Sequence, residues 1–312
     1  MVFSAKNTIF AMLMQIDDIH RYILSQFHFQ PTQEQNLALI TFARFMTDPD
    51  TMAVMVLRGC AGTGKTSLAG AMVRTMDRLR QKVVLLAPTG RAAKVFALNS
   101  GHTAYTIHRR IYRERSYSGL SGRFSLNDNL YKDTLFMVDE ASMIGCGGGA
   151  LGDSDTFGSG DLLVDLVHYV YSGGNNRLLL IGDKAQLPPV GEAESPALMA
   201  EQLVGYGLKV YECDLNEVLR QAQDSGILYN ATVIRGMVTH DGDTHLPKIR
   251  LRGFADLCLM PGNELIESLV TSYSEVGVDE TMVVTRSNKR SNIYNQGIRN
   301  MVLDREEELA TG

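Results

Sequence analysis

The sequence predicts an α/β fold in which a parallel sheet carries helices on both faces. Four short runs are nearly continuous in apolar residues, as in strands buried on both sides of such a sheet; they span residues 53–57, 83–87, 134–138 and 178–181. Helical patterns accompany them at residues 33–46, 65–80 and 162–171. Strands that alternate with helices are typical of right-handed βαβ crossovers. Because ligands bind at the carboxyl ends of the strands in these sheets, we expect the chemistry directly after each of the four runs.

Composition narrows the class of protein. The 312 residues suggest about two domains. With 45% hydrophobic and 21% charged residues, the chain can bury a sizeable core, which argues against a disordered tail. The 30 basic and 35 acidic residues give a net charge of −5, which excludes a protein that is basic overall but leaves local basic patches open. The 4 cysteines form no Cys-x-x-Cys pair, so a disulfide framework or zinc ribbon is disfavoured and a reducing, cytoplasmic location is predicted.

The first 30 residues are expected to form a helical segment. The apolar residues 9–14 are too few to span a bilayer, and they lead directly into Asp17 and Asp18. An amphipathic helix that continues through Ile16 and Ile19 explains them better, so no membrane partner is expected.

A glycine-rich loop follows the first predicted strand. Residues 59–66 read GCAGTGKT, a complete G-x-x-x-x-G-K-T pattern between a strand and a helix. The glycines let backbone N–H groups turn towards phosphate oxygens, and the positive end of the helix dipole faces the same point. Lys65 is expected to reach the β- and γ-phosphates of a nucleoside triphosphate, and the Thr66 hydroxyl to bind Mg²⁺. The residues expected to hold the nucleotide here are Gly59, Gly62, Thr63, Gly64, Lys65, Thr66 and Ser67.

Two carboxylates follow the third predicted strand. Asp139, at such a strand end, is expected to hold Mg²⁺ through water. Glu140 beside it is placed to orient or deprotonate an attacking water, which hydrolysis requires. An acidic helix N-terminus would explain either carboxylate alone. The pair, together with the loop at residues 59–66, indicates nucleotide hydrolysis.

The fourth predicted strand leads into residues 182–190, which read GDKAQLPPV. Gln186 is suited to sensing the γ-phosphate, as glutamines do in other nucleotide hydrolases. The two prolines fix the turn that follows. Taken alone, the segment would be an ordinary proline-terminated loop.

In this combination and order, the motifs resemble those of the superfamily 1 DNA helicases, above all the RecD-like and Dda-like branch, whose members move 5′ to 3′ on single strands. Further segments match in the family's order. Residues 32–35 (TQEQ) resemble the Q-motif, residues 87–94 (APTGRAAK) and 106–108 (TIH) resemble strand-contacting motifs, and residues 217–221 (EVLRQ) resemble a motif that carries an arginine. The resemblance spans roughly residues 30–300, and its specificity rests on several motifs in the correct order.

The resemblance implies ATP and Mg²⁺ as cofactors and single-stranded DNA as a partner. Gln35 would read adenine, and Arg220 would stabilise charge on the γ-phosphate as an arginine finger. DNA phosphates would be held without sequence preference by Pro88, Thr89, Gly90, Lys94 and His108. Outside the family context, Arg220 would be read as an exposed, salt-bridging arginine and His108 as a structural histidine.

Two segments interrupt the rhythm of strands and helices. Residues 109–132 cluster Arg, Tyr, Ser and Gly where the family inserts a small β-hairpin. Basic residues interleaved with aromatics suit single-strand binding, but an exposed basic loop with a small local core has the same composition, so both interpretations stay open. Residues 145–160 are rich in glycine with little to bury, which predicts a mobile loop.

A second domain is expected after residue 220, where strands and helices no longer alternate regularly in the sequence pattern. Its one predicted strand covers residues 281–285, and residues 285–292 resemble a stretch early in the family's second RecA-like domain. Family members continue well beyond this point, so we expect an incomplete second domain and a truncated product. The expected domains are therefore 1–30, helical; 31–220, the first RecA-like ATPase domain; and 221–312, the partial second domain.

The sequence thus leads to the hypothesis of an ATP-dependent DNA helicase or translocase. The residues expected to act in catalysis are Lys65, Glu140, Gln186 and Arg220. Other recombination or repair proteins are further candidate partners. One alternative is a non-motor P-loop protein, either a regulatory switch or an inactive subunit of a recombination nuclease complex, which explains the glycine loop but not the carboxylate pair. A small-molecule kinase is a third interpretation, for which the sequence offers no recognisable acceptor site.

Overall fold

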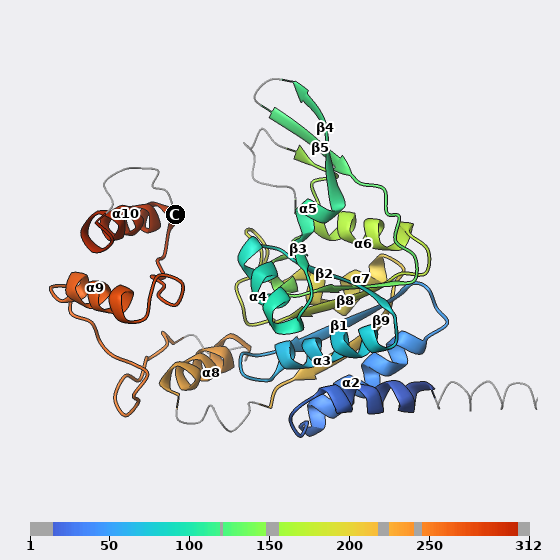
Figure 1. Cartoon of the computed structure of the whole chain (residues 1–312), viewed down its shortest axis with the longest axis horizontal. Helices are drawn as coiled ribbons and strands as arrows, with labels where there is room; N and C mark the ends of the chain where they lie inside the picture. The colour runs from blue at the N-terminus through green and yellow to red at the C-terminus, as the bar shows by residue number, and fades with distance from the viewer. Residues whose placement is uncertain (1–14, 119–120, 148–155, 218–224, 240–244, 305–312) are drawn as a thin grey trace, which may run out of the picture. The chain divides into compact units, whose positions relative to one another are not determined.

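The computed structural model describes residues 15–118, 121–147, 156–217, 225–239 and 245–304. Its contacts divide the chain into two compact units (Figure 1). The first comprises residues 1–224 and 231–247, and the second comprises residues 225–230 and 248–312. The predicted boundary after residue 220 falls within residues 218–224, which lie outside the described residues.

A six-stranded sheet with the order β3-β2-β6-β8-β1-β9 forms the centre of the first unit. Its strands all run parallel, which confirms the predicted fold class. They are β1 (Ala53–Gly59), β2 (Lys82–Ala87), β3 (Ala104–Thr106), β6 (Thr134–Val138), β8 (Arg177–Gly182) and β9 (Lys209–Leu215). The four strands predicted from apolar runs are all present. Two were missed, because β3 has 3 residues and β9 lies at the sheet edge, where charged side chains break the apolar run.

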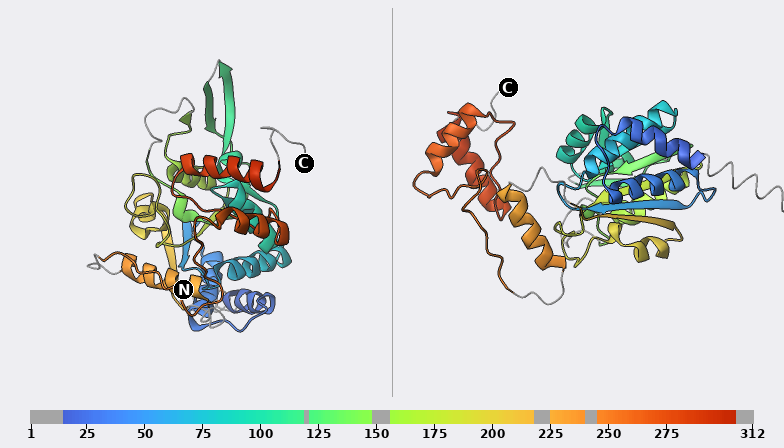
Figure 2. Two further views of the ribbon diagram at one scale, coloured as in Figure 1. Left: turned by 90° about the vertical axis from the view of Figure 1, so that its left-hand side faces the viewer. Right: turned by 90° about the horizontal axis from the view of Figure 1, so that it is seen from below.

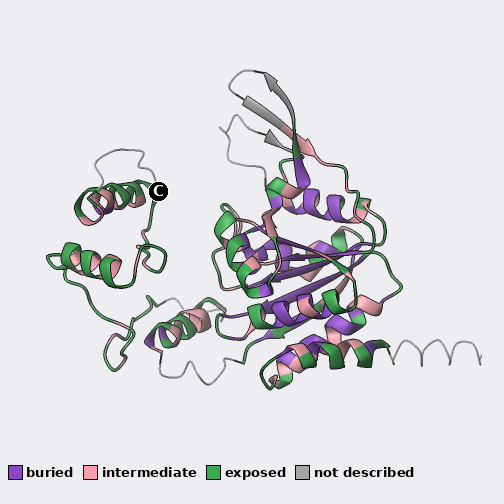
Figure 3. Ribbon diagram, viewed as in Figure 1, coloured by how far each residue is buried: buried purple, intermediate pink, exposed green. Residues whose placement is uncertain are grey.

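Helices cover both faces of this sheet (Figure 2). One face packs against the helix of residues 15–26 and against α2 (Gln33–Thr47), α3 (Lys65–Arg78) and α4 (Gly90–Ser100). The other face packs against α5 (Ile107–Ile111), α6 (Leu162–Ser172) and α7 (Ala200–Gly205). Alternate residues of β1 serve the two cores: Met55 and Leu57 lie in the first, and Val54 and Val56 in the second. The buried strands between exposed helix faces are evident in Figure 3.

A smaller sheet emerges from residues 109–132, as predicted. Strand β4 (Tyr112–Ser118) pairs antiparallel with β5 (Ser121–Leu126). Strand β7 (Thr156–Phe157) joins β5 in parallel. The predicted mobile loop over residues 145–160 is therefore wrong at 156–157, where pairing with β5 supplies backbone hydrogen bonds that composition does not reveal. Residues 148–155 of that loop lie outside the described residues.

The regular elements described in the second unit are helices. It contains α9 (Leu265–Glu275), α10 (Asn288–Gly297), a π-helical turn at Ile298–Val302, and the first residues of α8 (Gly226–Thr239). The strand predicted at residues 281–285 is wrong, because this stretch has no strand partner among the described residues. An apolar run forms a strand only when a neighbour accepts its backbone hydrogen bonds. Over the described part of the chain, no helix combines the length and apolar character needed to cross a bilayer.

Candidate active site

The carboxyl ends of the parallel strands bring the predicted motifs to one edge of the sheet. In the strand order, β1 lies between β8 and β9, and β6 is the next neighbour of β8. The segments that follow these four strands, beginning at residues 60, 139, 183 and 216, therefore lie along one part of this edge. The segments after β2 and β3 lie along the rest of it. One edge thus carries a phosphate-binding loop on one side and the predicted DNA contacts on the other.

The loop between β1 and α3 has the backbone that its glycines permit. Gly62 and Gly64 have φ of 81° and 84°, a left-handed conformation that other residues adopt at a cost. A Cβ on Gly59 would lie 2.7 Å from the Thr63 hydroxyl, so a side chain there would displace the loop. Thr66 and Ser67 lie exposed on the first turn of α3. The loop thereby presents a helix N-terminus, where backbone N–H groups attract anions.

Lys65 lies over the loop and is largely buried. Its Nζ donates to the carbonyl oxygen of Gly59 at 2.6 Å and to that of Cys60 at 2.9 Å. Burial lowers the pKa of Lys65, and the negative charges of Asp183 and Glu140 oppose that shift. The ammonium group is thus surrounded by acceptors and ready to exchange them for phosphate oxygens.

The N-terminus of α2 contacts the loop through Gln35, which is 2% exposed. The Gln35 Nε2 donates to the Thr63 carbonyl oxygen at 2.9 Å. Its Oε1 accepts from the Thr32 N–H at 3.0 Å, and Thr32 in turn caps the helix. Both ends of the Gln35 amide are therefore engaged, one with the loop and the other with the start of α2, and the adenine contact predicted for Gln35 stays a proposal.

The two carboxylates after β6 differ in their surroundings. Asp139 accepts from the Glu140 N–H at 3.0 Å. Burial raises the pKa of Asp139, the charge of Glu140 raises it further, and the charge of Lys65 opposes the rise. Glu140 has φ of 54°, a left-handed conformation that is costly for a residue with a Cβ. Backbone strain of this kind is concentrated at functional sites.

A hydrogen bond links the motifs after β6 and β8. The Ser142 hydroxyl donates to the Gln186 Oε1 at 2.8 Å. Close packing brings the two segments together, because a Cβ on Gly182 would lie 3.1 Å from the Ser142 backbone nitrogen. Gln186 is thus held by a residue of the segment that follows the carboxylate pair, and its predicted role as a phosphate sensor stays a proposal.

Three charged residues at this edge carry no role in the motif-based interpretation. Asp183 is buried and accepts from the Ala185 N–H at 2.9 Å and from the Arg235 guanidinium at 2.8 Å. Arg58, which is 7% exposed, precedes the loop and donates to both carboxylate oxygens of Asp214, at 2.7 and 2.8 Å. The Arg58 hydrogen bond lowers the pKa of Asp214. A buried arginine at the end of a predicted strand is a signal for such an ion pair, but its partner cannot be read from the sequence.

The predicted DNA contacts lie after β2 and β3. Pro88 and Gly90 flank Thr89, whose hydroxyl accepts from the Ala92 N–H at 3.2 Å and so caps α4. Lys94 is exposed on the first turns of the same helix, and His108 is exposed on α5. These groups face solvent near two helix N-termini, which favours phosphate binding.

Some arginines of the hairpin region are engaged within the protein. The Arg110 guanidinium lies over the Tyr105 ring at 4.0 Å, and Arg113 pairs with Asp128 at 3.1 Å. The contact of Arg110 with Tyr105 supports the local-core interpretation, whereas the Arg113 pair is exposed. Arg109 is exposed, and the side chains of residues 115–123 lie outside what the structure describes.

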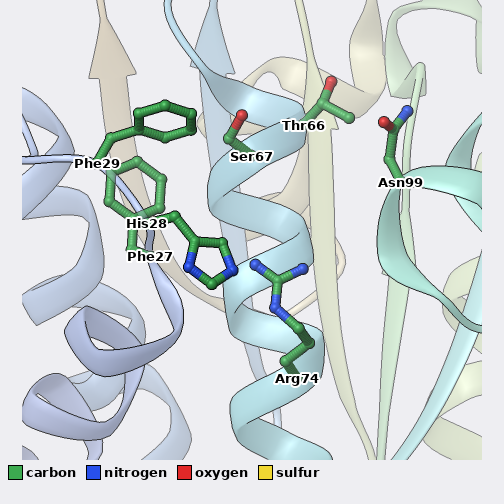
Figure 4. A pocket seen from close by; sticks show the side chains of 7 residues that line it. All are labelled: Phe27, His28, Phe29, Thr66, Ser67, Arg74 and Asn99. Atoms are coloured by element: carbon green, nitrogen blue, oxygen red, sulfur yellow. The ribbon is translucent and has the colours of Figure 1, made fainter.

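A recess of about 230 Å³ lies beside the first turn of α3 (Figure 4). Phe27, His28 and Phe29 line one side, and Thr66, Ser67, Arg74 and Asn99 line the rest. The Phe29 ring is 67% exposed, although it packs edge-on against the Phe27 ring at 6.1 Å. An exposed aromatic ring beside a phosphate-binding helix is suited to stacking on a flat base.

The Mg²⁺ ligands predicted from the sequence are Thr66 and Asp139, and this role stays a proposal. Among the described residues, no three His, Cys, Asp or Glu side chains gather to hold a metal ion. Mg²⁺ usually keeps several waters and takes one or two protein ligands plus phosphate oxygens. The Thr66 hydroxyl and the Asp139 carboxylate offer a donor set of that kind. The predicted arginine, Arg220, lies outside the described residues.

Comparison with known proteins gives the site its context. Residues 32–149 match the family described as the AAA domain. The chain is 32% identical to the ATP-dependent RecD2 DNA helicase of Deinococcus radiodurans over 194 residues, which is 62% of this chain. It spans about a quarter (23%) of the length of that RecD2 relative.

Two solved structures are also similar to this chain. One is the Pif1 helicase from Bacteroides in complex with ADP-AlF3 and ssDNA, at 16% identity and a TM-score of 0.45, covering 90% of this chain and 58% of that one. The other is the Pif1 helicase from Candida albicans, at 16% identity and a TM-score of 0.48, covering 88% and 55%.

Proposed function

We propose that this chain is the ATP-hydrolysing part of a DNA helicase or translocase that moves on single-stranded DNA, with 5′ to 3′ as its direction. The observation that carries the proposal is the single sheet edge on which a phosphate-binding loop, a carboxylate pair and a linked glutamine adjoin two exposed helix N-termini. The sequence similarity to a RecD2 DNA helicase supports it.

In this mechanism each residue has a distinct task. Lys65 exchanges its hydrogen bonds to the loop carbonyl oxygens for contacts with the β- and γ-phosphates. Glu140 takes a proton from the attacking water, and Arg220 stabilises charge on the γ-phosphate. Mg²⁺, held by Thr66 and through water by Asp139, would neutralise phosphate charge. Gln186, hydrogen-bonded to Ser142, would relay the state of the γ-phosphate towards the DNA-contacting half of the sheet edge. Opening and closing of the nucleotide site would then step the protein along the strand.

DNA contact is tested by Lys94→Ala. We expect oligothymidylate affinity, measured by fluorescence anisotropy, to fall, and the slope of log affinity against log salt to decrease by about 1, because one phosphate contact is lost. The matched control is Lys82→Ala. Lys82 is also exposed, but it begins β2 and so lies at the amino ends of the strands, away from the predicted DNA contacts. ATP hydrolysis by the wild-type chain that does not respond to oligothymidylate would count against the motor proposal.

The recess beside α3 is proposed to take the adenine base, with Phe29 stacking on it. Phe29→Ala is expected to weaken ATP and ADP equally, by about tenfold, because base stacking is lost and no phosphate contact changes. Leu37→Ala is the control, since Leu37 is an exposed apolar residue on nearby α2. Unchanged affinities in Phe29→Ala, measured by calorimetric titration, would exclude this recess as the base site.

A further inference from the structure

A buried ion pair beside the phosphate-binding loop has no task in the proposed mechanism. Asp183 is 6% exposed, and the Arg235 guanidinium donates to its Oδ1 at 2.8 Å. The same oxygen accepts from the Ala185 N–H at 2.9 Å. Arg235 lies on α8, and both charged residues belong to the first compact unit. Burying two charges is unfavourable unless they are paired, and removing one partner leaves the other charge without compensation.

The pairing of β1 with β8 places Asp183 next to the start of the loop. The two strands run parallel with Arg58 opposite Gly182, so the next residues along them are Gly59 and Asp183. Neighbouring strands lie about 5 Å apart. The Gly59 carbonyl oxygen accepts from the Lys65 Nζ at 2.6 Å. Burial lowers the pKa of Lys65, and among the negative charges that oppose this shift, that of Asp183 has the largest effect.

Three carboxylates act on Lys65 where a phosphate chain would bind. They are those of Asp139, Glu140 and Asp183. Each of them repels a polyanion that binds to Lys65. In the proposed mechanism Asp139 binds Mg²⁺ through water and Glu140 takes a proton, which accounts for two of the three charges. The charge of Asp183 is left over, and the Arg235 guanidinium is placed to offset it.

We propose that Arg235 is a positioning residue of the nucleotide site. By binding Asp183 it offsets the negative charge of that carboxylate, so that Lys65 stays available to phosphate and the phosphates are not repelled. A guanidinium keeps its charge at all physiological pH values, which suits it to this task. The inference rests on the proposed function, because it takes Lys65 as a phosphate ligand.

The critical variant is Arg235→Gln, studied in the full chain. Glutamine can still donate a hydrogen bond to Asp183 but carries no charge. We expect the affinity for a slowly hydrolysed ATP analogue to fall by about tenfold, because a negative charge without compensation then lies beside the phosphates. ADP carries one phosphate group fewer, so its affinity should fall less. Calorimetric titration measures both affinities.

A second substitution separates charge compensation from general support of the fold. Asp183→Asn keeps an oxygen for the Ala185 N–H but removes the charge. Combined with Arg235→Gln, it should therefore return the affinity for the ATP analogue to about that of wild type. Asp183→Asn alone should bind the analogue at least as tightly as wild type does. Arg44→Ala removes an exposed positive charge from the last turn of α2 and, as the control, should change neither affinity.

The outcomes decide the inference as follows. A loss of affinity in Arg235→Gln that Asp183→Asn does not restore would overturn it, because Arg235 would then only support the fold. Wild-type affinities in Arg235→Gln, or equal losses for the ATP analogue and ADP, would overturn it as well. If Arg235→Gln does not fold, Asp183→Asn alone decides, and binding weaker than that of wild type overturns the inference.

Lys65→Ala distinguishes this inference from the proposed function. If Lys65→Ala binds the ATP analogue like wild type, the phosphate-binding role of Lys65 and the inference fail together. If Lys65→Ala loses affinity while Arg235→Gln does not, only the inference is overturned and the proposed function stands.

Discussion

Glu140→Gln is expected to leave ATP bound while its hydrolysis falls by about 10²- to 10⁴-fold, the contribution of a well-placed general base. Glutamine keeps the size of the side chain and its acceptor oxygen but cannot take a proton from water. The left-handed backbone at position 140 costs glutamine about as much free energy as glutamate, so the fold should not change. Single-turnover hydrolysis and equilibrium binding of ATP, measured on the same preparation, check the expectation.

The same variant separates a motor from a nucleotide switch. A protein that binds ATP without hydrolysing it would show no difference between wild type and Glu140→Gln. Glu201→Gln serves as control, because Glu201 is an exposed acid on the first turn of α7. If Glu201→Gln lowered hydrolysis as much as Glu140→Gln does, the loss would reflect overall charge, and the role given to Glu140 would be wrong.

Asp139→Asn is expected to raise thermal stability while Mg²⁺-dependent hydrolysis collapses. Burial raises the pKa of Asp139 in the folded protein, so the folded state binds this proton more tightly than the unfolded chain does. The stabilising contribution of the group is therefore present at low pH and is lost as pH rises from the ordinary range of an aspartate to the raised pKa. At neutral pH the buried charge is a cost, which an amide avoids.

The measurement is the melting temperature between pH 3 and pH 8 without nucleotide or Mg²⁺. The difference between Asp139→Asn and wild type should grow as pH rises and then level off. At neutral pH the gain should be about 2–4 °C, the shift that ~1 kcal/mol produces in a domain of this size. Asp128→Asn is the control, since its ion pair with Arg113 is exposed and contributes little. A variant less stable than wild type at neutral pH would contradict this account.

The strands that sequence reasoning found share one property, which is burial on both faces. Residues 135–138 are apolar throughout and buried, as expected of a strand covered on both faces, and such runs can be recognised without a structure. Strand β9 was missed because it lies at the edge, where Lys209 and Glu212 can reach solvent. The error at residues 281–285 has the opposite cause, since an apolar run is not a strand unless a second strand accepts its hydrogen bonds.

Within the site, the sequence alone determined what depends on local backbone and on neighbouring residues. The loop at residues 59–66 is an example, because its glycines and the helix that follows need no distant partner. Only the tertiary structure decided which motifs meet. The pairs Ser142 and Gln186, Gln35 and Thr63, and Glu34 and Asn216 form because parallel strands return to one edge in an order that spacing along the chain does not encode. Hydrogen bonds between side chains are set by that spatial order, and burial then lowers the pKa of Lys65 and raises that of Asp139.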